Sequence, residues 1–380
     1  MRTPLCDAFG IDVPIFAFSH CRDVVAAVSQ AGGFGVLGAL AFSPEQLEIE
    51  LKWIDEHIGG KPYGVDVVMP ATYKRSEAGD FAKADLEKML PEGHKQWIEQ
   101  LLARYDVPKL PDSFVARIDT LLGWSESGGR RHVEIALKHP IRLLVNALGP
   151  PPKDVIDRAH EHGVKVAALV GSVAQAQKQV ALGVDVIVAQ GWEAGGHTGD
   201  VSSMVLIPEV VDAVSPVPVL AAGGIGCGRQ AAAGLALGAQ GVWTGSIWLT
   251  VAEAEASPVL TEKLLRASSR DTVRTRSMTG KPARLLRTPW TEAWDGPESP
   301  GPLPMPLQFM LNADAQARIG HYARAERSRA RELVGIPVGQ IVGRMNEVRP
   351  TREVVHEMIS EFVDTIERLE GMLSAAEKKS

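Results

Sequence analysis

The stretch VDVIVAQGWEAGGHTG, residues 184–199, joins an unbroken apolar run to a glycine-rich loop. The run at residues 184–190 predicts a strand buried on both faces, which is typical of a parallel sheet covered by helices. Only small residues, three of them glycines, surround His197 after Ala194. An imidazole at the carboxyl end of a strand can face a ligand from such a loop, so His197 is our first candidate for catalysis. The alternative is a histidine that only hydrogen-bonds to its own loop.

Seven further apolar runs, bounded by glycine, proline or acidic residues, also predict strands. They are PIFAF (14–18), GFGVLG (33–38), YGVDVV (63–68), IRLLVNAL (141–148), VKVAALV (164–170), PVPVLAAG (216–223) and GVWTG (241–245). An amphipathic stretch of helical length separates most consecutive runs. This alternation predicts a (β/α)8 TIM barrel, with an open doubly wound sheet as the alternative.

Two segments interrupt the alternation. Residues 70–140 are rich in charged side chains and predict a helical insertion after the third strand, either a lid over the site or a peripheral elaboration. Residues 251–380 include a proline-rich tract and a charged terminal helix, and predict an extension that packs on the barrel. The barrel itself is expected to comprise residues 1–69 and 141–250.

Composition narrows the class of protein. The formal charge is -6, from 40 Lys and Arg against 46 Asp and Glu, and no basic block suggests a partner among nucleic acids or anionic membranes. The three cysteines form no C-x-x-C pair, which argues against disulfides or structural zinc and favours a reducing cytoplasm. The amino terminus has neither a signal-peptide nor a membrane-anchor pattern, and no metal-ligand spacing is present. We expect a cytoplasmic enzyme, monomeric or homodimeric, with a small-molecule partner.

Two glycine clusters, AAGGIGCG (221–228) and TGSIW (244–248), follow the seventh and eighth runs. In a barrel this pair of loops commonly forms a phosphate site, because glycine lets backbone N–H groups approach the anion and a helix end adds partial positive charge. The predicted phosphate contacts are Gly223, Gly224, Gly245 and Ser246. The chain lacks the P-loop motif, and SHCRD (19–23) follows the first run, where a G-x-G-x-x-G dinucleotide motif would be required.

The decapeptide QGWEAGGHTG (190–199) matches Q-G-x-E-A-G-G-H-x-G of the class I nitronate monooxygenases, formerly called 2-nitropropane dioxygenases. AAGGI and VWTGS follow in the order expected of that family. The chain is also similar to the related FMN-dependent enoyl-acyl-carrier-protein reductases. The resemblance runs from residue 14 to 248, skips the insertion, and returns weakly in GKPAR (280–284) and GQIVG (339–343). It implies an FMN enzyme built on a TIM barrel.

The resemblance also implies roles for particular residues. It places the FMN phosphate at the four glycine-cluster residues named above, and His197 beside the substrate over the flavin. The remaining expected flavin contacts lie at strand ends and in the histidine loop: Ala17, Phe18, Ser19, Asp66, Gln190, Gly195 and Gly196.

Two departures from the family concern the pocket. Asp66 stands in GVD where the family usually has G-V-N, and a carboxylate only accepts hydrogen bonds and adds negative charge. We therefore expect it to make the flavin harder to reduce or to use a different partner. The family's P-I-x-Q-A-P-M is replaced by PIFAFSH (14–20), so backbone contacts would survive while substrate recognition by side chains would change.

Three more residues need an interpretation. His20 stands where the family has methionine near the ring and is a candidate for the substrate pocket, the alternative being a histidine that faces solvent. Trp192 is a second candidate for the pocket wall, although aromatic residues near strand ends are as often core. Glu193 is expected to tie down its loop through backbone N–H groups rather than to act as a base.

The favoured function is the oxidation of alkyl nitronates with O2 to a carbonyl compound and nitrite. In it His197 holds the nitronate and removes the α-proton of a neutral nitroalkane. The alternative is an NAD(P)H-dependent reductase of enoyl thioesters carried by acyl carrier protein or CoA. A third hypothesis is an inactive flavin-binding regulatory protein.

Overall fold

A closed barrel of eight parallel strands forms within the residues that the computed structural model describes, 1–69, 83–111 and 126–377. The last strand pairs with the first, with Val242 opposite Ile15. The predicted TIM barrel is confirmed, and each predicted run holds one strand. In order around the barrel the strands are β1 (Ile15–Ser19), β2 (Phe34–Gly38), β3 (Tyr63–Val67), β4 (Leu143–Asn146), β5 (Lys165–Val170), β6 (Val186–Gln190), β8 (Val219–Ala222) and β9 (Gly241–Thr244).

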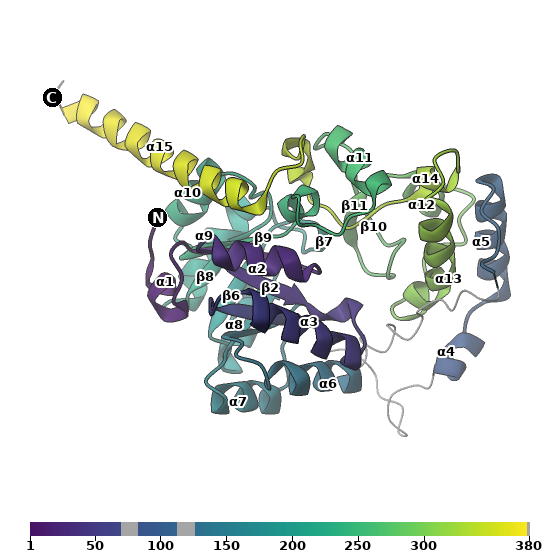
Figure 1. The fold of residues 1–380 in the computed structure, drawn as a ribbon, viewed down its shortest axis with the longest axis horizontal. Helices are drawn as coiled ribbons and strands as arrows, with labels where there is room; N and C mark the ends of the chain where they lie inside the picture. Colours follow the sequence, from purple (N-terminus) through teal and green to yellow (C-terminus); the bar gives the residue numbers. More distant parts are fainter. Residues whose placement is uncertain (70–82, 112–125, 378–380) are drawn as a thin grey trace.

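Helices surround this barrel (Figure 1). They are α2 (Arg22–Gln30), α3 (Pro44–His57), α6 (Glu126–Ala136), α7 (Lys153–Glu161), α8 (Val173–Ala181), α9 (Ser203–Val214) and α10 (Gly228–Ala236). Successive strand side chains point to opposite faces. In β1, Ile15 and Ala17 accordingly pack in the layer between strands and helices, whereas Phe16 packs inside the barrel.

The amino end of the barrel is plugged by α1 (Pro4–Phe9). The Phe9 ring meets Phe16 and Phe34 edge-on, with ring centroids 5.4 and 5.2 Å away, and all three side chains are buried. The interior is therefore packed at this end, which leaves the carboxyl ends of the strands for a ligand.

A small second sheet lies above those carboxyl ends. Its strand order is β10 (Thr272–Thr275), β11 (Ala283–Leu286) and β7 (Gly196–His197), and Ala283 lies opposite His197 in an antiparallel pair. The sequence predicts a loop over residues 191–199. Gly196 and His197 form a strand because they pair with Arg284 and Ala283, more than 80 residues later in the chain. No local sequence pattern predicts a pairing between segments so far apart.

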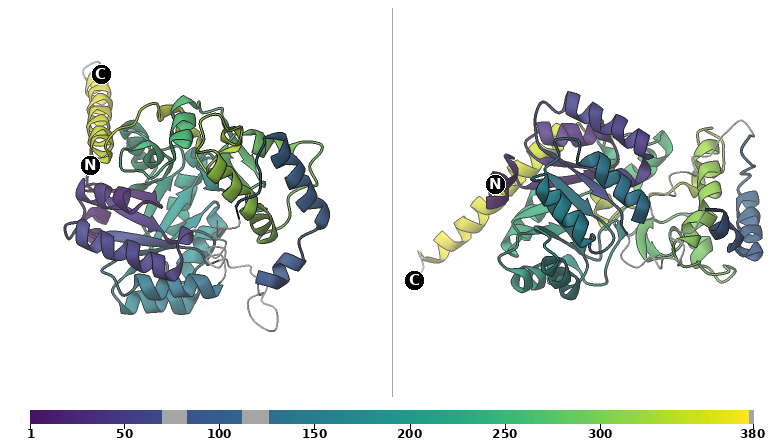
Figure 2. Two further views of the ribbon diagram at one scale, coloured as in Figure 1. Left: turned by 45° about the vertical axis from the view of Figure 1, so that its right-hand side comes forward. Right: turned by 90° about the horizontal axis from the view of Figure 1, so that it is seen from below.

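Helices of the insertion and the extension pack together beside the barrel (Figures 1 and 2). Their core includes Trp97, Trp290 and Trp294, with the rings of Trp97 and Trp294 4.6 Å apart. The helices are α4 (Lys83–Lys88), α5 (Glu92–Arg104), α12 (Pro289–Asp295), α13 (Leu307–Tyr322) and α14 (Ala330–Leu333). Residues 70–82 and 112–125 of the insertion lie outside the described residues, so a lid there stays a prediction.

The last helix, α15 (Thr351–Glu377), begins against α10 and ends well away from the body (Figure 1). Gly228, the first residue of α10, lies so close to Met358 and Phe362 that a β-carbon would collide with their backbone atoms. Among the described residues, none of the helices combines the length and the apolar character needed to cross a membrane.

Candidate functional site

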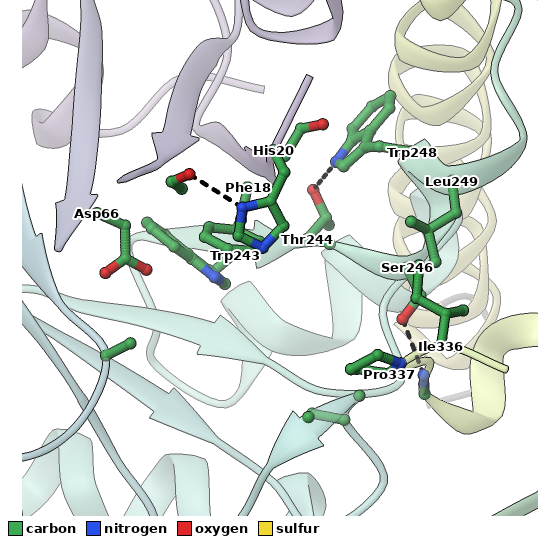
Figure 3. A pocket seen from close by; sticks show the side chains of 18 of the residues that line it. Phe18, His20, Asp66, Trp243, Thr244, Ser246, Trp248, Leu249, Ile336 and Pro337 are labelled. Atoms are coloured by element: carbon green, nitrogen blue, oxygen red, sulfur yellow. Dashed lines mark hydrogen bonds between the residues drawn. The ribbon is translucent and has the colours of Figure 1, made fainter. Parts of the chain in front are cut away.

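A cavity of about 520 Å³ opens at the carboxyl ends of the barrel strands. Figure 3 shows Asp66, Phe18, Trp243 and His20 on one side of this cavity, and Ser246, Ile336 and Pro337 on the opposite side. The predicted site residues that line it are Phe18, Ser19, His20, Asp66, Gln190, Gly195, Gly196, His197, Gly223, Gly224, Gly245 and Ser246. The structure therefore brings together residues spread over more than 200 positions of sequence.

Two predicted residues lie outside the cavity lining. The alternation along β1 turns Ala17 outward into the helix layer, where it is fully buried. Trp192 is 36% exposed and stacks under the guanidinium of Arg284, which lies 4.2 Å from its ring centroid. That guanidinium also donates to the Trp192 carbonyl from Nη2 at 3.1 Å. Trp192 thus helps fasten its loop to β11 rather than forming the pocket wall.

His197 lies on the cavity wall with both ring nitrogens engaged. Its Nδ1 is 3.1 Å from the carbonyl oxygen of Pro282, which can only accept, so Nδ1 carries the proton of the neutral ring. The hydroxyl of Thr279 lies 3.3 Å from Nε2. Burial and the positive charge of Lys281 lower the pKa of His197, although the bond to Pro282 opposes them. His197 is therefore neutral at pH 7, with the lone pair of a base on Nε2.

Asp66 points into the barrel from β3 and is 3% exposed. Its Oδ1 has no hydrogen-bond partner among the described residues. Burial raises the pKa of this carboxyl to about 8, although a hydrogen bond from the backbone of Ala147 opposes the shift. At neutral pH the side chain is mostly a neutral acid, which both donates and accepts. The expected negative charge beside a cofactor ring is therefore mostly lost at neutral pH.

His20 lines the cavity, as proposed, and its side chain is exposed there. Its Nδ1 donates to the carbonyl oxygen of Gly38 at 2.9 Å, and its ring meets Phe18 edge-on. Gly38 leaves space for the imidazole, because a β-carbon there would lie 2.6 Å from two ring atoms. Burial lowers the pKa of His20, so the ring is a neutral hydrogen-bonding group at the pocket.

The two glycine loops border the cavity together. Gly223 and Gly224 both have positive φ, 96° and 68°, a backbone conformation that favours glycine. The expected helix end is elsewhere: α10 begins at Gly228, which packs against α15 and is not part of the cavity lining. Any anion at these loops would therefore meet loop N–H groups and the Ser246 hydroxyl rather than the end of α10.

A segment absent from the predicted site closes the cavity from outside. Gly339 donates its N–H to the Ser246 hydroxyl at 2.9 Å, and Gln340 donates to the carbonyl of Glu193 at 3.0 Å. A β-carbon on Gly195 would lie 2.8 Å from the nitrogen of Gly339, so the two backbones touch. This segment, residues 336–341, is called the strap here; it contributes Ile336, Pro337, Gly339 and Ile341 to the lining. The only sequence signal for it was the weak family match at residues 339–343.

Glu193 has the structural role expected of it. Its two carboxylate oxygens accept from the backbone N–H of Ser203 at 3.3 and 3.2 Å. Ser203 is the first residue of α9, where a helix has unpaired N–H groups and favours negative charge. Glu193 therefore anchors the histidine loop to α9.

Cys21, Asp23 and Glu255 place three potential ligand atoms within 4.8 Å of one another. Burial raises the pKa of the Cys21 thiol, and its Sγ donates to the carbonyl of Glu253 at 3.2 Å. A protonated thiol is a poor metal ligand. We assign this cluster no role.

Comparisons with known proteins agree with this geometry. The family model described as nitronate monooxygenase matches residues 3–361. A Mycobacterium tuberculosis protein assigned as a monooxygenase is 55% identical over 98% of this chain and 100% of its own length. A Staphylococcus aureus protein assigned as a nitronate monooxygenase is 30% identical over 84% of this chain and 88% of its own.

Two solved structures resemble the whole chain. Nitroalkane oxidase from Streptomyces ansochromogenes has a TM-score of 0.76 at 25% identity and covers 96% of this chain and 99% of its own. FabK from Thermotoga maritima has a TM-score of 0.71 at 26% identity and covers 98% of this chain and 99% of its own.

Proposed function

This chain belongs to the nitronate monooxygenase family and is an oxidoreductase, and from that premise we propose that it oxidises alkyl nitronates with O2 to a carbonyl compound and nitrite. The proposal includes FMN as the cofactor, held in the cavity at the carboxyl ends of the strands. The observation that carries it is His197, a neutral imidazole that lines the cavity, with its Nδ1 proton fixed by the Pro282 carbonyl and its basic nitrogen, Nε2, 3.3 Å from the Thr279 hydroxyl.

The residues present fit FMN. The cavity of about 520 Å³ has room for a flavin, and Gly223, Gly224, Gly245 and Ser246 are suited to its phosphate. The buried Oδ1 of Asp66 needs a partner, and a flavin edge with donor and acceptor atoms can supply one. When bound, FMN supplies electron transfer between substrate and O2.

His197 then has two tasks. For a neutral nitroalkane, Nε2 takes the proton from the α-carbon and leaves the nitronate anion. For a nitronate supplied as such, the imidazole holds the anion in position. Lys281, whose charge acts on His197, favours an anionic occupant of the same region.

The experiment compares His197→Asn with the wild type on nitroethane and on ethyl nitronate, with nitrite release as the measurement. General-base catalysis typically contributes about 10²- to 10⁴-fold, so nitroethane turnover should fall by at least about 100-fold. Nitronate turnover should fall less, and the flavin content should be unchanged. The control is His162→Asn, an exposed histidine after α7.

Equal losses of flavin and of turnover on both substrates would contradict the catalytic role. The cofactor is tested separately by releasing it with heat and measuring its mass, where FAD or the absence of any flavin would refute the FMN assignment.

A second candidate is the NAD(P)H-dependent reduction of an enoyl thioester. The likeness to FabK supports it, as do Leu249, Leu260 and Ile336, which make part of the cavity wall apolar enough for an acyl chain. Stoichiometric NADH or NADPH oxidation on addition of an enoyl thioester would favour this reaction, and nitrite release from a nitronate would favour the first.

A further inference from the structure

His20 directly follows β1 and presents one ring nitrogen to the cavity. Its Nδ1 carries the proton of the neutral ring, because the bond of 2.9 Å to Gly38 ends on a carbonyl oxygen, which can only accept. Nε2 is then an unprotonated acceptor, and none of the described residues hydrogen-bonds to it. Figure 3 shows the bond at Nδ1 and the other ring nitrogen directed away from it. His20 therefore offers a basic nitrogen to whatever occupies the cavity.

The residues around His20 hold the ring in this orientation. Its edge meets the ring of Phe18, which stacks on Trp243 with ring centroids 6.3 Å apart. The turn that carries His20 is fixed as well, because the Ser19 hydroxyl accepts the backbone N–H of Cys21 at 3.1 Å. The direction of Nε2 is thus set by the folded barrel end before any ligand arrives.

The cavity offers little positive charge to an anion. Among the described residues that line it there is neither a lysine nor an arginine. The titratable side chains of the lining are those of His20, Cys21, Asp66, His197 and Glu255. A thiol or a carboxyl group is neutral or negative in either protonation state. Only the two histidines can become positive, by taking up a proton.

The two histidines differ in the surroundings of Nε2. In His197 this nitrogen is 3.3 Å from the hydroxyl of Thr279, a buried residue outside the cavity lining. It therefore already has a polar neighbour. The Nε2 of His20 has none among the described residues, so a proton added there would meet a ligand first.

The charge on His20 depends on the occupant of the cavity. Burial lowers its pKa, its backbone hydrogen bond opposes the shift, and no charged side chain contributes. The titratable groups that line the cavity with it are Cys21, the next residue, Asp66 on β3, His197 on β7 and Glu255 beyond β9. The ring is thus neutral at pH 7 in the empty cavity. An anion within reach of Nε2 would favour the protonated ring instead.

We propose that His20 is an anion-binding residue that takes up a proton when a nitronate enters the cavity, and that its Nε2–H then donates to a nitronate oxygen. The proton comes from solvent, and no covalent bond of the nitronate changes in this step. The inference rests on the proposed function in one respect, namely that the anion is a nitronate. His197 remains the base for a neutral nitroalkane, and His20 supplies the positive partner of the anion.

The test measures binding without turnover, with propionate as the probe. Propionate has as many non-hydrogen atoms as ethyl nitronate, and its carboxylate stays ionised between about pH 6 and pH 9. Propionamide has the same shape without the charge and is the matched ligand. Isothermal titration calorimetry of the holoenzyme gives the Kd. Above about pH 6.5 the Kd of propionate should rise by about tenfold per pH unit, while that of propionamide should stay constant.

His20→Gln removes the titratable ring and keeps a polar group of similar reach. A hydrogen bond to a charged group changes an equilibrium by about 10- to 100-fold, so at pH 6 the variant should bind propionate more weakly by that factor. Its Kd for propionate should no longer depend on pH, and its Kd for propionamide should match the wild type. His197→Asn, the comparison variant, should keep the pH dependence of the wild type. If His20→Gln does not fold, His20→Asn provides the same comparison.

Several outcomes would overturn the role of His20. They are propionate binding that does not change with pH, an equal pH dependence in the wild type and His20→Gln, and no propionate binding at any pH. Loss of the pH dependence in His197→Asn alone would assign the proton to His197 instead. Nitrite release is not part of this test. A protein that binds propionate as expected but releases no nitrite would contradict the proposed function and leave the anion site at His20 in place.

Discussion

The cavity has two walls of different origin. The barrel wall consists of strand ends and the short loops after them, with residues such as Asp66, Gln190 and Gly223. The outer wall consists of Met278 and the strap, which come from segments far along the chain. Each barrel-wall residue lies within a few positions of an apolar run that predicts its strand. The outer wall is held by backbone contacts between distant segments, so its position depends on the folded barrel.

The largest expected effect concerns the barrel wall. It is the change in the free energy of unfolding caused by Asp66→Asn. The folded pKa of about 8 lies above the ordinary value of 3.8, so between these values the folded protein keeps a proton that the unfolded chain releases. The contribution of Asp66 to the stability of the wild type should therefore fall as pH rises from about 4 to about 8, by at most about 1.4 kcal/mol per pH unit. Residue 66 makes no such pH-dependent contribution in Asp66→Asn, because an amide does not titrate in this range.

Urea unfolding at pH 5 and pH 8 measures the effect. The advantage of Asp66→Asn over the wild type should be a few kcal/mol at pH 8 and smaller at pH 5. Asp212→Asn, on the exposed face of α9, is the matched control. A difference between variant and wild type that does not change with pH would show that Asp66 is ionised in the folded protein.

The second prediction tests the outer wall through Gly339→Ala. The new β-carbon would lie 2.9 Å from the carbonyl oxygen of Glu193 and 3.0 Å from the nitrogen of Gly195, both of them backbone atoms. Overpacking of this kind costs about 1–3 kcal/mol, and the strap should shift away from the histidine loop. Flavin retention after gel filtration and thermal unfolding are the measurements.

Gly320→Ala is the control for that variant, because Gly320 lies within α13 with no atom within 4 Å of a new β-carbon. It should be neutral or stabilising. Unchanged flavin retention and stability in Gly339→Ala would mean that the strap does not shape the site.

The third prediction concerns the loop between the two walls, through Glu193→Gln. The change removes negative charge at the start of α9 and weakens the bonds to Ser203, which should cost about 0.5–1 kcal/mol. Turnover should persist at close to the wild-type rate, because Glu193 anchors the loop and is not the base. Glu209→Gln on the exposed face of the same helix is the control, and a large loss of turnover confined to Glu193→Gln would assign the carboxylate a catalytic role.

The sequence predicts the barrel wall better than the outer wall, and the reason is physical. An apolar run indicates a strand that is buried on both faces, so β3, β6 and β9 could be predicted from their own residues. Asp66, Gln190 and Gly245 could then be placed in or just after these strands. The pairing of His197 with Ala283 depends on a chain reversal that no local pattern encodes. Thr279 could not be identified either, because a threonine beside a glycine is typical of any turn.

The direction of a side chain is also only partly predictable. Alternation along β1 separates Phe18, at the cavity, from Ala17, in the helix layer, once the register is known. For Trp192 the deciding contact is Arg284, which lies 92 positions away. The packing of Gly228 against α15 likewise depends on the last helix of the chain and not on the glycine cluster itself.

The plug formed by α1 has a consequence for the order of events at the site. With Phe9 seated against Phe16 and Phe34, the described residues close the barrel at its base, so substrate and product pass through the end that carries the carboxyl ends of the strands. A molecule bound at this end of the barrel blocks access to the rest of the cavity. Arrival and departure therefore take place at one end of the barrel, and a bulky compound held at the strap would obstruct that end without touching the reacting atoms.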